Sequence, residues 1–365
     1  MSILDETNKI FANALNLLPE LGPARLFKLL NYFGDYQTAW KANGRQYQSA
    51  GLDPKTVSLI IPKKPQINPE REWDKLKQKQ IAVILLSDAE YPPLLKEIPS
   101  PPPILYIRGS MQALKKDMLA VVGSRKMTLY GRQAINELAP PIVNSGLAIA
   151  SGLAFGVDAE ALSSCINAQG TPIAVLASSV DDRSISPKAN FLLAQKIIKS
   201  GCLVSEYPLG TQVYKTNFPQ RNRIISGMSI GTLVVEADLE SGALITANYA
   251  LEQNREVFAL PGSIFSEVSR GTNKLIKSGA KLVASYQDIL EELNISAEMA
   301  ANHENFEETP DEEVLLSSLS RNPMHIDDLI LAVKMAPAAV NSALTLLELK
   351  GRVKNLGGAK YVKIR

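Results

Sequence analysis

The chain has 365 residues, which is more than one ordinary hydrophobic core accommodates, so two or three domains are expected. Its composition, 45% hydrophobic and 21% charged, is typical of a globular protein. A formal net charge of only +2 excludes a generally basic surface, so any polyanion would have to bind at a local basic patch.

Residues 1–69 are predicted to form a small all-α domain. The start, MSILDETNKI, has no long apolar run, so we expect neither a signal peptide nor a membrane span, and a cytoplasmic protein. In LNLLPELGPARLFKLLNYFG, apolar residues recur at helical spacing on both sides of the turn ELGP. This pattern suggests a helix-hairpin-helix or SAM-like module that binds phosphate, with Arg25 and Lys28 nearby. An ordinary packing module is the alternative.

Residues 70–295 are predicted to form an α/β core with a mostly parallel sheet. Short apolar, largely β-branched runs alternate there with helical stretches, a rhythm typical of a parallel sheet with helices on both faces. The runs are IAVILL, MLAVVGS, LAIASGLA, PIAVLAS, CLVSEYP, GTLVVEA and REVFALPG. SPPP before ILYIRG predicts an extended connector. Pro140 and Pro141 predict a kink, or two shorter pieces, in the first crossover helix.

The acidic stretch HENFEETPDEE indicates a linker over residues 296–310. Residues 311–365 contain three helical patterns and two strands around Gly357-Gly358, the outline of a winged helix. The third helix offers mostly Ala, Val and Leu, whereas a duplex reader needs side chains that reach base edges. The basic residues lie in the wing: Arg352, Lys354, Lys360 and Lys363. We therefore expect a protein contact or a loose phosphate contact here.

Glycines, hydroxyls and charged residues gather where the predicted strands end. In a parallel sheet these ends form one edge, where ligands bind, and helix N-termini at this edge attract phosphate. The sequence therefore predicts an anion site there. The candidate residues are Gly123, Ser124 and Arg125, with Ser151, Gly152, Gly156, Asp158, Glu236, Ser241 and Gly242 as possible pocket edge.

The stretch TNFPQRNRIISG supplies the rest of the predicted site. Its candidate DNA-binding residues, with the lysine just before it, are Lys215, Phe218, Arg221, Asn222 and Arg223. Positive charge beside an aromatic face is the combination that binds single strands of any sequence. In the alternative interpretation, Arg221 and Arg223 pair with Glu206 and Glu236 in an internal network.

Signatures of nucleotide-binding and hydrolytic enzymes are missing. The chain has no G-x-G-x-x-G after the first strand of the sheet, no P-loop and no G-x-S-x-G elbow. Asp158, Glu206 and Glu236 remain as possible acids or bases, although hydrogen bonds to loop backbone or pairs with the arginines are the more ordinary role. The chain holds only Cys165, Cys202, His303 and His325 as soft ligands. We therefore expect no metal, no cofactor and no catalysis.

Together, AVVGSR, ASGLAFGVD, SEYPLG with NFPQRNRIISG, LVVEADLESGALITA and ALPG resemble the DNA processing protein A family, DprA, also called Smf. The match is ordered from about Ile81 to Leu293 and extends more loosely to both ends. The resemblance implies a Rossmann-like core that binds single-stranded DNA without catalysis, and dimers that load RecA recombinase during natural transformation. Its phosphate pocket would comprise Gly123, Ser124, Arg125, Lys215, Arg221 and Asn222, with Phe218 stacking.

Three places depart from the family pattern. Leu162 stands where a histidine is expected, residues 177–179 read ASS in place of a glycine-rich turn, and Ser186 replaces a tyrosine. These changes affect the side of the edge where a small ligand would bind and leave the basic side intact. Family dimers form through the later part of the core, where Leu275 and Ile276 are candidate contacts and core packing is their alternative role.

An enzyme acting on nucleotides, such as a nucleoside-monophosphate phosphoribohydrolase, is the competing interpretation. Those enzymes share this type of sheet but characteristically carry P-G-G-x-G-T, whereas this chain has LPGSIFSEVSRGT. A protein scaffold that acts only through the winged helix would leave the basic loop unexplained.

Overall fold

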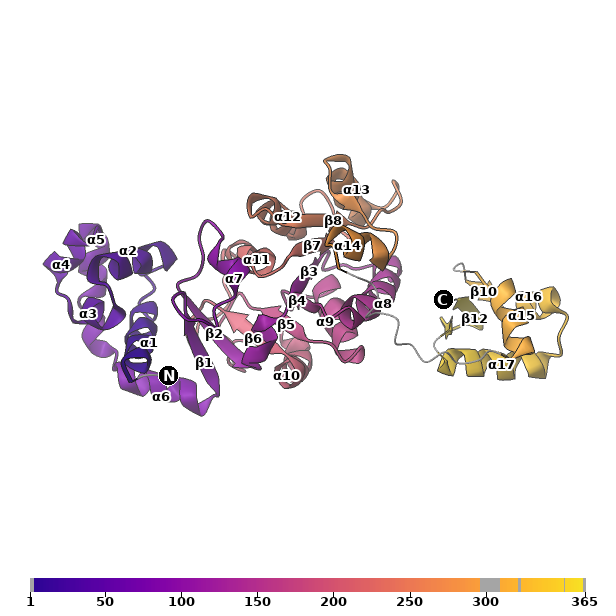
Figure 1. The fold of residues 1–365 in the computed structure, drawn as a ribbon, viewed down its shortest axis with the longest axis horizontal. Coiled ribbons are helices and arrows are strands. Elements are labelled where there is room, and N and C mark those ends of the chain that lie inside the picture. The colour runs from indigo at the N-terminus through magenta and orange to yellow at the C-terminus, as the bar shows by residue number, and fades with distance from the viewer. Residues whose placement is uncertain (1–2, 296–308, 321–322, 351, 364–365) are drawn as a thin grey trace. The chain divides into compact units, whose positions relative to one another are not determined.

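The computed structural model describes residues 3–295, 309–320, 323–350 and 352–363, and the chain forms two compact units, residues 1–300 and 301–365 (Figure 1). Residues 296–308 of the predicted linker lie outside the described residues. The predicted boundary between residues 1–69 and 70–295 falls inside the first unit, so this division stays a prediction.

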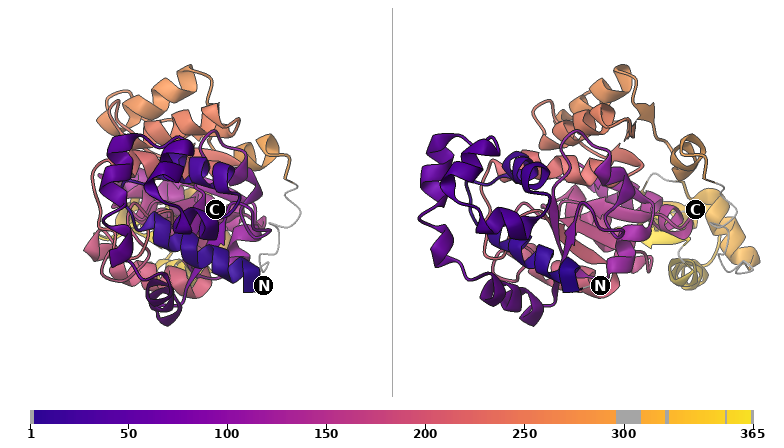
Figure 2. Two further views of the ribbon diagram at one scale, coloured as in Figure 1. Left: turned by 90° about the vertical axis from the view of Figure 1, so that its left-hand side faces the viewer. Right: turned by 60° about the vertical axis from the view of Figure 1, so that its left-hand side comes forward.

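Helices α1 to α6 precede the first strand. They are α1 (Ile3–Asn16), α2 (Pro23–Phe33), α3 (Tyr36–Lys41), α4 (Gly44–Ser49), α5 (Pro54–Ile60) and α6 (Pro69–Gln78). Asp or Asn side chains cap the starts of α3 to α6, as helix N-termini require. The apolar residues of this segment share one core cluster with the neighbouring edge of the sheet. These helices lie in front of the sheet in the left view of Figure 2.

Polar contacts also join the N-terminal helices to the sheet. Lys9 and Asp88 form a largely buried ion pair at 2.7 Å, and the Tyr106 hydroxyl donates to Asn13 Oδ1 at 2.9 Å. The predicted cations of the hairpin are engaged within this segment. Arg25 donates to the carbonyl of residue 20 at 2.9 Å, and Lys28 donates to the carbonyl of residue 51 at 3.1 Å. Phosphate binding by the hairpin therefore stays a prediction.

The first unit is built on a nine-stranded sheet in the order β1-β2-β6-β5-β4-β3-β7-β8-β9. The strands are β1 (Ile81–Leu85), β2 (Ile104–Gly109), β3 (Met118–Val122), β4 (Ala148–Ser151), β5 (Pro172–Val175), β6 (Cys202–Ser205), β7 (Gly231–Val234), β8 (Glu256–Ala259) and β9 (Lys281–Leu282). In this order, every neighbouring pair from β6 through β5, β4, β3, β7 and β8 to β9 is parallel. Strand β2 is antiparallel to both of its neighbours, β1 and β6. The predicted mostly parallel sheet is confirmed, and β2 and β9 are additional strands.

Helices cover both faces of the sheet. They are α7 (Pro93–Lys96), α8 (Leu129–Asn144), α9 (Val157–Asn167), α10 (Phe191–Ser200), α11 (Asn217–Gly227), α12 (Gly242–Glu252), α13 (Glu267–Lys277) and α14 (Tyr286–Glu292). Along β3, Leu119 and Val121 pack with α8, α9 and α14, whereas Ala120 and Val122 pack with α11 and α12. This alternation is what a strand buried on both faces requires.

Helix α8 runs through Pro140 and Pro141 as one helix, so the predicted division into two shorter pieces is wrong. Each proline lacks the N–H that would donate to the carbonyl four residues earlier, yet the helical conformation continues to Asn144. The Ser145 N–H still donates to the Pro141 carbonyl at 3.0 Å and closes the C-terminal end.

The second unit is a winged helix, as predicted. It contains α15 (Pro310–Ser318), β10 (Met324–His325), α16 (Ile326–Val333), α17 (Pro337–Leu349), β11 (Val353–Asn355) and β12 (Lys360–Lys363) around one apolar core. The short β10 pairs with β12 and was not predicted. Among the described helices, no single one is long and apolar enough to cross a membrane; only α16 with Pro337–Glu348, bent by 112°, passes such a test as a pair.

Candidate nucleic-acid interface

A cavity of about 400 Å³ opens at the carboxyl edge of the sheet, next to β3 and β7. The strand order reverses there, because β4 to β6 lie on one side of β3 and β7 to β9 on the other. Ligands of open α/β sheets bind at this position. The lining residues are Val122, Gly123, Ser124, Arg125, Lys126, Ala154, Asp158, Phe218, Pro219, Arg221, Asn222, Ile225, Asp238, Ser241, Gly242, Ala243, Ile245 and Thr246.

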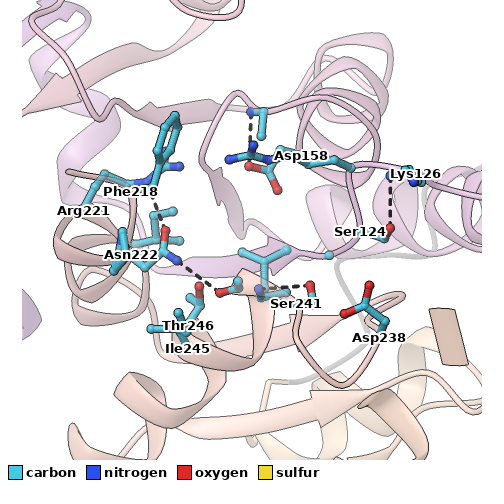
Figure 3. A pocket seen from close by; sticks show the side chains of 18 residues that line it. Ser124, Lys126, Asp158, Phe218, Arg221, Asn222, Asp238, Ser241, Ile245 and Thr246 are labelled. Atoms are coloured by element: carbon cyan, nitrogen blue, oxygen red, sulfur yellow. Dashed lines mark hydrogen bonds between the residues drawn. The ribbon is translucent and has the colours of Figure 1, made fainter. Parts of the chain in front are cut away.

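The structure thus brings together most of the predicted DNA-binding residues. The exceptions are Lys215 and Arg223, which do not line the cavity. Of the predicted pocket edge, Asp158, Ser241 and Gly242 line it. The other nine lining residues include five on α11 and α12, namely Pro219, Ile225, Ala243, Ile245 and Thr246. Figure 3 shows Ser124 and Lys126 on one side of the cavity, and Phe218 and Asn222 on the other.

The segment 123–128, which we call the basic loop, is held in place by Glu236. This residue is 2% exposed and follows β7. Its backbone carbonyl accepts from the Ser124 N–H at 2.6 Å, and its carboxylate accepts from the N–H of Thr128 at 2.8 Å and from the Thr128 hydroxyl. Thr128 is also the N-cap of α8. Glu236 therefore anchors both ends of the loop, and its predicted pairing with an arginine does not occur.

Two exposed cations lie on the basic loop. Arg125 and Lys126 make no ion pair with any described residue. The Arg125 guanidinium lies 4.9 Å from the centre of the Phe218 ring, which is a cation–π contact. Lys126 directly follows the predicted motif but was not included in it. Its N–H donates to Ser124 Oγ at 3.0 Å, which orders this turn of the loop.

Arg221 lies beneath this surface and is only 3% exposed. Its Nη1 donates to the carbonyl of Gly152 at 2.7 Å and to that of Val175, and these carbonyls lie at the ends of β4 and β5. Burial lowers the pKa of Arg221 to about 10, against the opposing effect of the Asp158 carboxylate, so the group stays charged at neutral pH. A Cβ at Gly152 would lie 2.5 Å from this guanidinium. The arginine therefore fastens α11 to the sheet edge.

Arg223 confirms the internal-pairing alternative. Its Nη2 lies 2.5 Å from Glu206 Oε2, and the side chains are 13% and 6% exposed. Burial raises the pKa of Glu206 even though Arg223 opposes this. Arg223 is thereby neutralised away from the cavity. Lys215, by contrast, is exposed on the loop that leads into α11.

Asn222 links the two helices that border the cavity. Its Oδ1 accepts from Arg221 Nε at 3.2 Å, and its Nδ2 donates to the Gly242 carbonyl at 3.3 Å. Ser241 caps α12 by accepting from the Ala243 N–H at 3.3 Å. A Cβ at Gly242 would meet no atom within 4 Å, so the first turn of α12 is open on this side. Anions bind at such helix N-termini.

Ser151 and Gly156, predicted at the pocket edge, support the site without lining it. The Ser151 hydroxyl is buried and donates to the Val121 carbonyl at 2.6 Å, which ties β4 to β3. Gly156 has φ +74°, and a Cβ there would lie 2.3 Å from the Ser124 carbonyl oxygen. Only glycine fits this close approach to the basic loop.

The places that depart from the family pattern are occupied by the protein itself. Leu162 is fully buried in an apolar cluster. Ser179 and Ser184 donate to the Asp181 carboxylate, the latter at 2.9 Å, and the Gly210 N–H donates to the same oxygen at 3.3 Å. Burial would raise the pKa of Asp181, but these hydrogen bonds lower it. This polar network fills the side of the edge where a small ligand would bind.

The predicted dimer residues lie on α13. Leu275 is partly buried and packs against the core cluster beneath α11 and α12, which is its alternative role. Ile276 is half-buried. A dimer contact through either residue stays a prediction. Within the described residues, no three His, Cys, Asp or Glu side chains are grouped to hold a metal ion.

Comparison with known proteins connects this geometry to a family. Residues 82–294 match the family model of DNA recombination-mediator protein A, and residues 299–359 match the DprA winged helix domain. The chain is 32% identical to Protein Smf of Synechocystis, covering 93% of this chain and 95% of that protein. It is 44% identical to the DNA processing protein DprA of Bacillus subtilis, over 65% of this chain and 78% of the relative.

Solved structures of the same family resemble the fold of this chain. DNA processing protein A of Streptococcus pneumoniae superposes with a TM-score of 0.68 at 34% identity, covering 78% of this chain and 97% of that one. DNA processing protein A of Helicobacter pylori, described for its single-stranded DNA binding mode, superposes with a TM-score of 0.53 at 29% identity, over 59% of this chain and 96% of that one. The chain therefore belongs to the DprA/Smf family of DNA recombination mediators.

Proposed function

We propose that this protein binds single-stranded DNA without catalysis, at the cavity beside the basic loop. The observation that carries the proposal is the pair of exposed, unpaired cations, Arg125 and Lys126, next to the aromatic face of Phe218. Cations that follow a phosphate backbone and rings that stack on bases bind single strands regardless of sequence. The single-stranded DNA binding described for the Helicobacter pylori relative supports the same assignment.

The surroundings of the cations support phosphate as their ligand. The basic loop is anchored at both ends by Glu236, so Arg125 and Lys126 are presented from a fixed backbone. The open first turn of α12 and exposed Lys215 add positive potential on the opposite side. Arg221 and Arg223 are left out of the proposed contact surface, because backbone carbonyls and Glu206 occupy them.

We further propose that the protein acts in the cytoplasm as a homodimer and loads RecA onto the bound strand during natural transformation and recombination. The match to a recombination-mediator family supports this assignment. Ile276 is the better dimer candidate, since Leu275 packs against the core. For the winged helix we propose a protein contact. The exposed face of α17 presents Asn341, Ser342 and Thr345, which lack the charge of a phosphate-binding surface.

Binding of labelled oligo-dT, measured by fluorescence anisotropy at several salt concentrations, tests the central proposal. We expect tight, salt-sensitive binding by the wild type. Arg125→Ala should weaken binding by about 1–3 kcal/mol, because a charged contact and the stack on Phe218 are lost. Lys196→Ala, which removes an exposed cation of α10, is the matched control and should bind normally. Absence of oligo-dT binding, or release of free base from nucleoside monophosphates, would favour an enzyme instead.

The dimer and RecA proposals need their own measurements. Sedimentation of the wild type should give a dimer, and Ile276→Glu should shift it to a monomer, because a charge is placed in an apolar contact. RecA assembly on a long oligonucleotide, followed by its ATP hydrolysis, should start sooner when the wild-type protein is present. A monomeric wild type, or an unchanged lag, would contradict the respective proposal.

A further inference from the structure

Phe155 is an exposed aromatic residue, adjacent in sequence to the cavity lining, that has no role in the site described so far. It lies between β4 and α9, and 49% of its surface is exposed. The preceding residue, Ala154, lines the cavity. A ring of this size in water forgoes the free energy of burial, which a ligand stacked on it would supply.

The loop around Phe155 fixes its outward position. Leu153 is fully buried and has φ +60°, an uncommon conformation for a residue with a side chain. Asn190 Nδ2 donates to the carbonyls of Leu153 and Ala154 at 2.9 and 3.2 Å. The Ala154 N–H donates to Asp158 Oδ2 at 3.2 Å. These contacts determine the backbone on the N-terminal side of Phe155, so its ring is presented from a rigid turn.

The residue after Phe155 connects this turn to the basic loop. A Cβ at Gly156 would lie 2.3 Å from the Ser124 carbonyl oxygen and 2.8 Å from the Arg125 carbonyl carbon, so the two backbones are in direct contact. Phe155 directly precedes the residue that makes this contact, and the Arg125 guanidinium lies over Phe218. The turn that carries Phe155 and the loop that carries Arg125 are thus in contact through their backbones.

We propose that Phe155 is a second base-stacking platform, which receives the nucleotide next to the one at Phe218. The proposal rests on the single-stranded DNA binding proposed above. In a single strand, a phosphate lies between each two successive bases. Arg125, on the loop that contacts the turn of Phe155 and with its guanidinium over Phe218, is the cation that would bind this phosphate. Stacking on an aromatic face accepts every base, so a second platform extends the contact without adding sequence preference.

Charge favours a nucleic acid over a protein as the occupant of this platform. Arg125 and Lys126, the exposed cations beside the turn, have no acidic partner among the described residues. A ligand that covers Phe155 must also neutralise them, and a phosphodiester brings one negative charge for each base that it places. The platform is also continuous with the cavity through Ala154.

Two substitutions of Phe155 test the proposal, with labelled oligo-dT and the full chain. Phe155→Ala should weaken binding about 5- to 150-fold, the loss expected for one stacked base. Phe155→Trp should bind about as tightly as the wild type. Its added indole fluorescence should fall on saturation with unlabelled oligo-dT, beyond any change in the wild type. Tyr32→Ala, a ring of 54% exposure on α2, is the matched control and should not alter binding.

The outcomes separate this inference from the function on which it rests. If the wild type does not bind oligo-dT, the proposed function fails. If the wild type binds but Phe155→Ala binds equally well, or the indole of Phe155→Trp does not respond to the oligonucleotide, the second platform is refuted and the proposed function stands. Normal oligo-dT binding by Phe155→Ala with impaired RecA assembly would likewise refute the platform and identify Phe155 as a protein contact.

Discussion

Replacing Arg221 with alanine tests whether this arginine of the signature stretch supports the fold or contacts DNA. The substitution removes a donor from the carbonyls of Gly152 and Val175, and it removes the cation whose charge opposes the effect of burial on the pKa of Asp158. A buried carbonyl left without a donor costs about 1–3 kcal/mol, and two carbonyls lose their donor here. A domain is stable by only about 5–15 kcal/mol, so the loss is a large fraction of the total.

Arg125→Ala provides the opposite case in the same cavity. The side chain is exposed and its guanidinium lies over the Phe218 ring, so the change in stability should stay within about 0.5 kcal/mol. Oligo-dT affinity should nevertheless fall. The two substitutions therefore separate a structural cation from a ligand-binding one, although both residues line the same cavity.

Urea unfolding followed by circular dichroism gives the stability, and anisotropy with labelled oligo-dT gives the affinity. We expect a clearly lower unfolding midpoint for Arg221→Ala and an unchanged midpoint for Arg125→Ala. Adding Asp158→Asn to Arg221→Ala should recover part of the stability, because the uncompensated charge is removed. An Arg221→Ala protein that unfolds at the wild-type midpoint and fails to bind oligo-dT would refute the structural role and make Arg221 a direct DNA contact.

Three further substitutions have defined outcomes. Glu236→Ala should release the Thr128 end of the basic loop, since the backbone carbonyl that holds Ser124 remains, and it should cost about 1–2 kcal/mol of stability together with oligo-dT affinity. Glu236→Gln, which keeps an acceptor for Thr128, should preserve both, and equal behaviour of the two variants in urea and anisotropy would contradict the anchoring role. Asp181→Asn should lower stability by about 1–3 kcal/mol at neutral pH. The folded-state pKa of Asp181 is lowered, so its contribution to stability is present above the ordinary carboxyl pKa of about 4. This contribution is lost as the pH falls through the lowered value. The urea midpoints of the wild type and of Asp181→Asn should therefore converge in acid. Gly156→Ala should weaken both stability and binding, since φ is +74° and the methyl group would meet the Ser124 carbonyl; a protein that matches the wild type in both assays would exclude this close contact.

The strands that the sequence predicted are those with both faces buried. A buried parallel strand reads as an unbroken apolar run, so the seven runs were visible without knowledge of their partners. ILYIRG in β2 has the same composition but was not included among the runs, and only the prolines before it were interpreted, as a connector. The two residues of β9 are exposed and show no pattern. Pairing with β8 alone defines that strand.

The location of the site was predictable from topology, but the direction of each arginine was not recognised. Successive helical residues turn by about 100°, so Arg221 and Arg223 on α11 point about 200° apart and cannot share a face. Phe218, Arg221, Asn222 and Ile225 follow the spacing i, i+3, i+4, i+7, which is one helical face, and all four line the cavity. Helical spacing alone therefore places Arg223 outside the face that lines the cavity. Glu206, the partner of Arg223, follows β6, so this ion pair became evident only from the fold.

The division of cations between interior and surface predicts how strongly salt affects binding. With Arg221 and Arg223 neutralised internally, Arg125, Lys126 and Lys215 remain as exposed cations in and beside the site. Three phosphate contacts predict a slope of log affinity against log salt near −2, since single strands give about −0.7 per contact. The formal net charge of only +2 offers no diffuse attraction beyond these contacts. A slope steeper than about −4 would require cations elsewhere. If the slope is that steep, replacing Lys354 and Lys360, which are exposed in the wing, with glutamine should restore a slope near −2. An unchanged steep slope in this double variant would exclude the wing as a DNA contact.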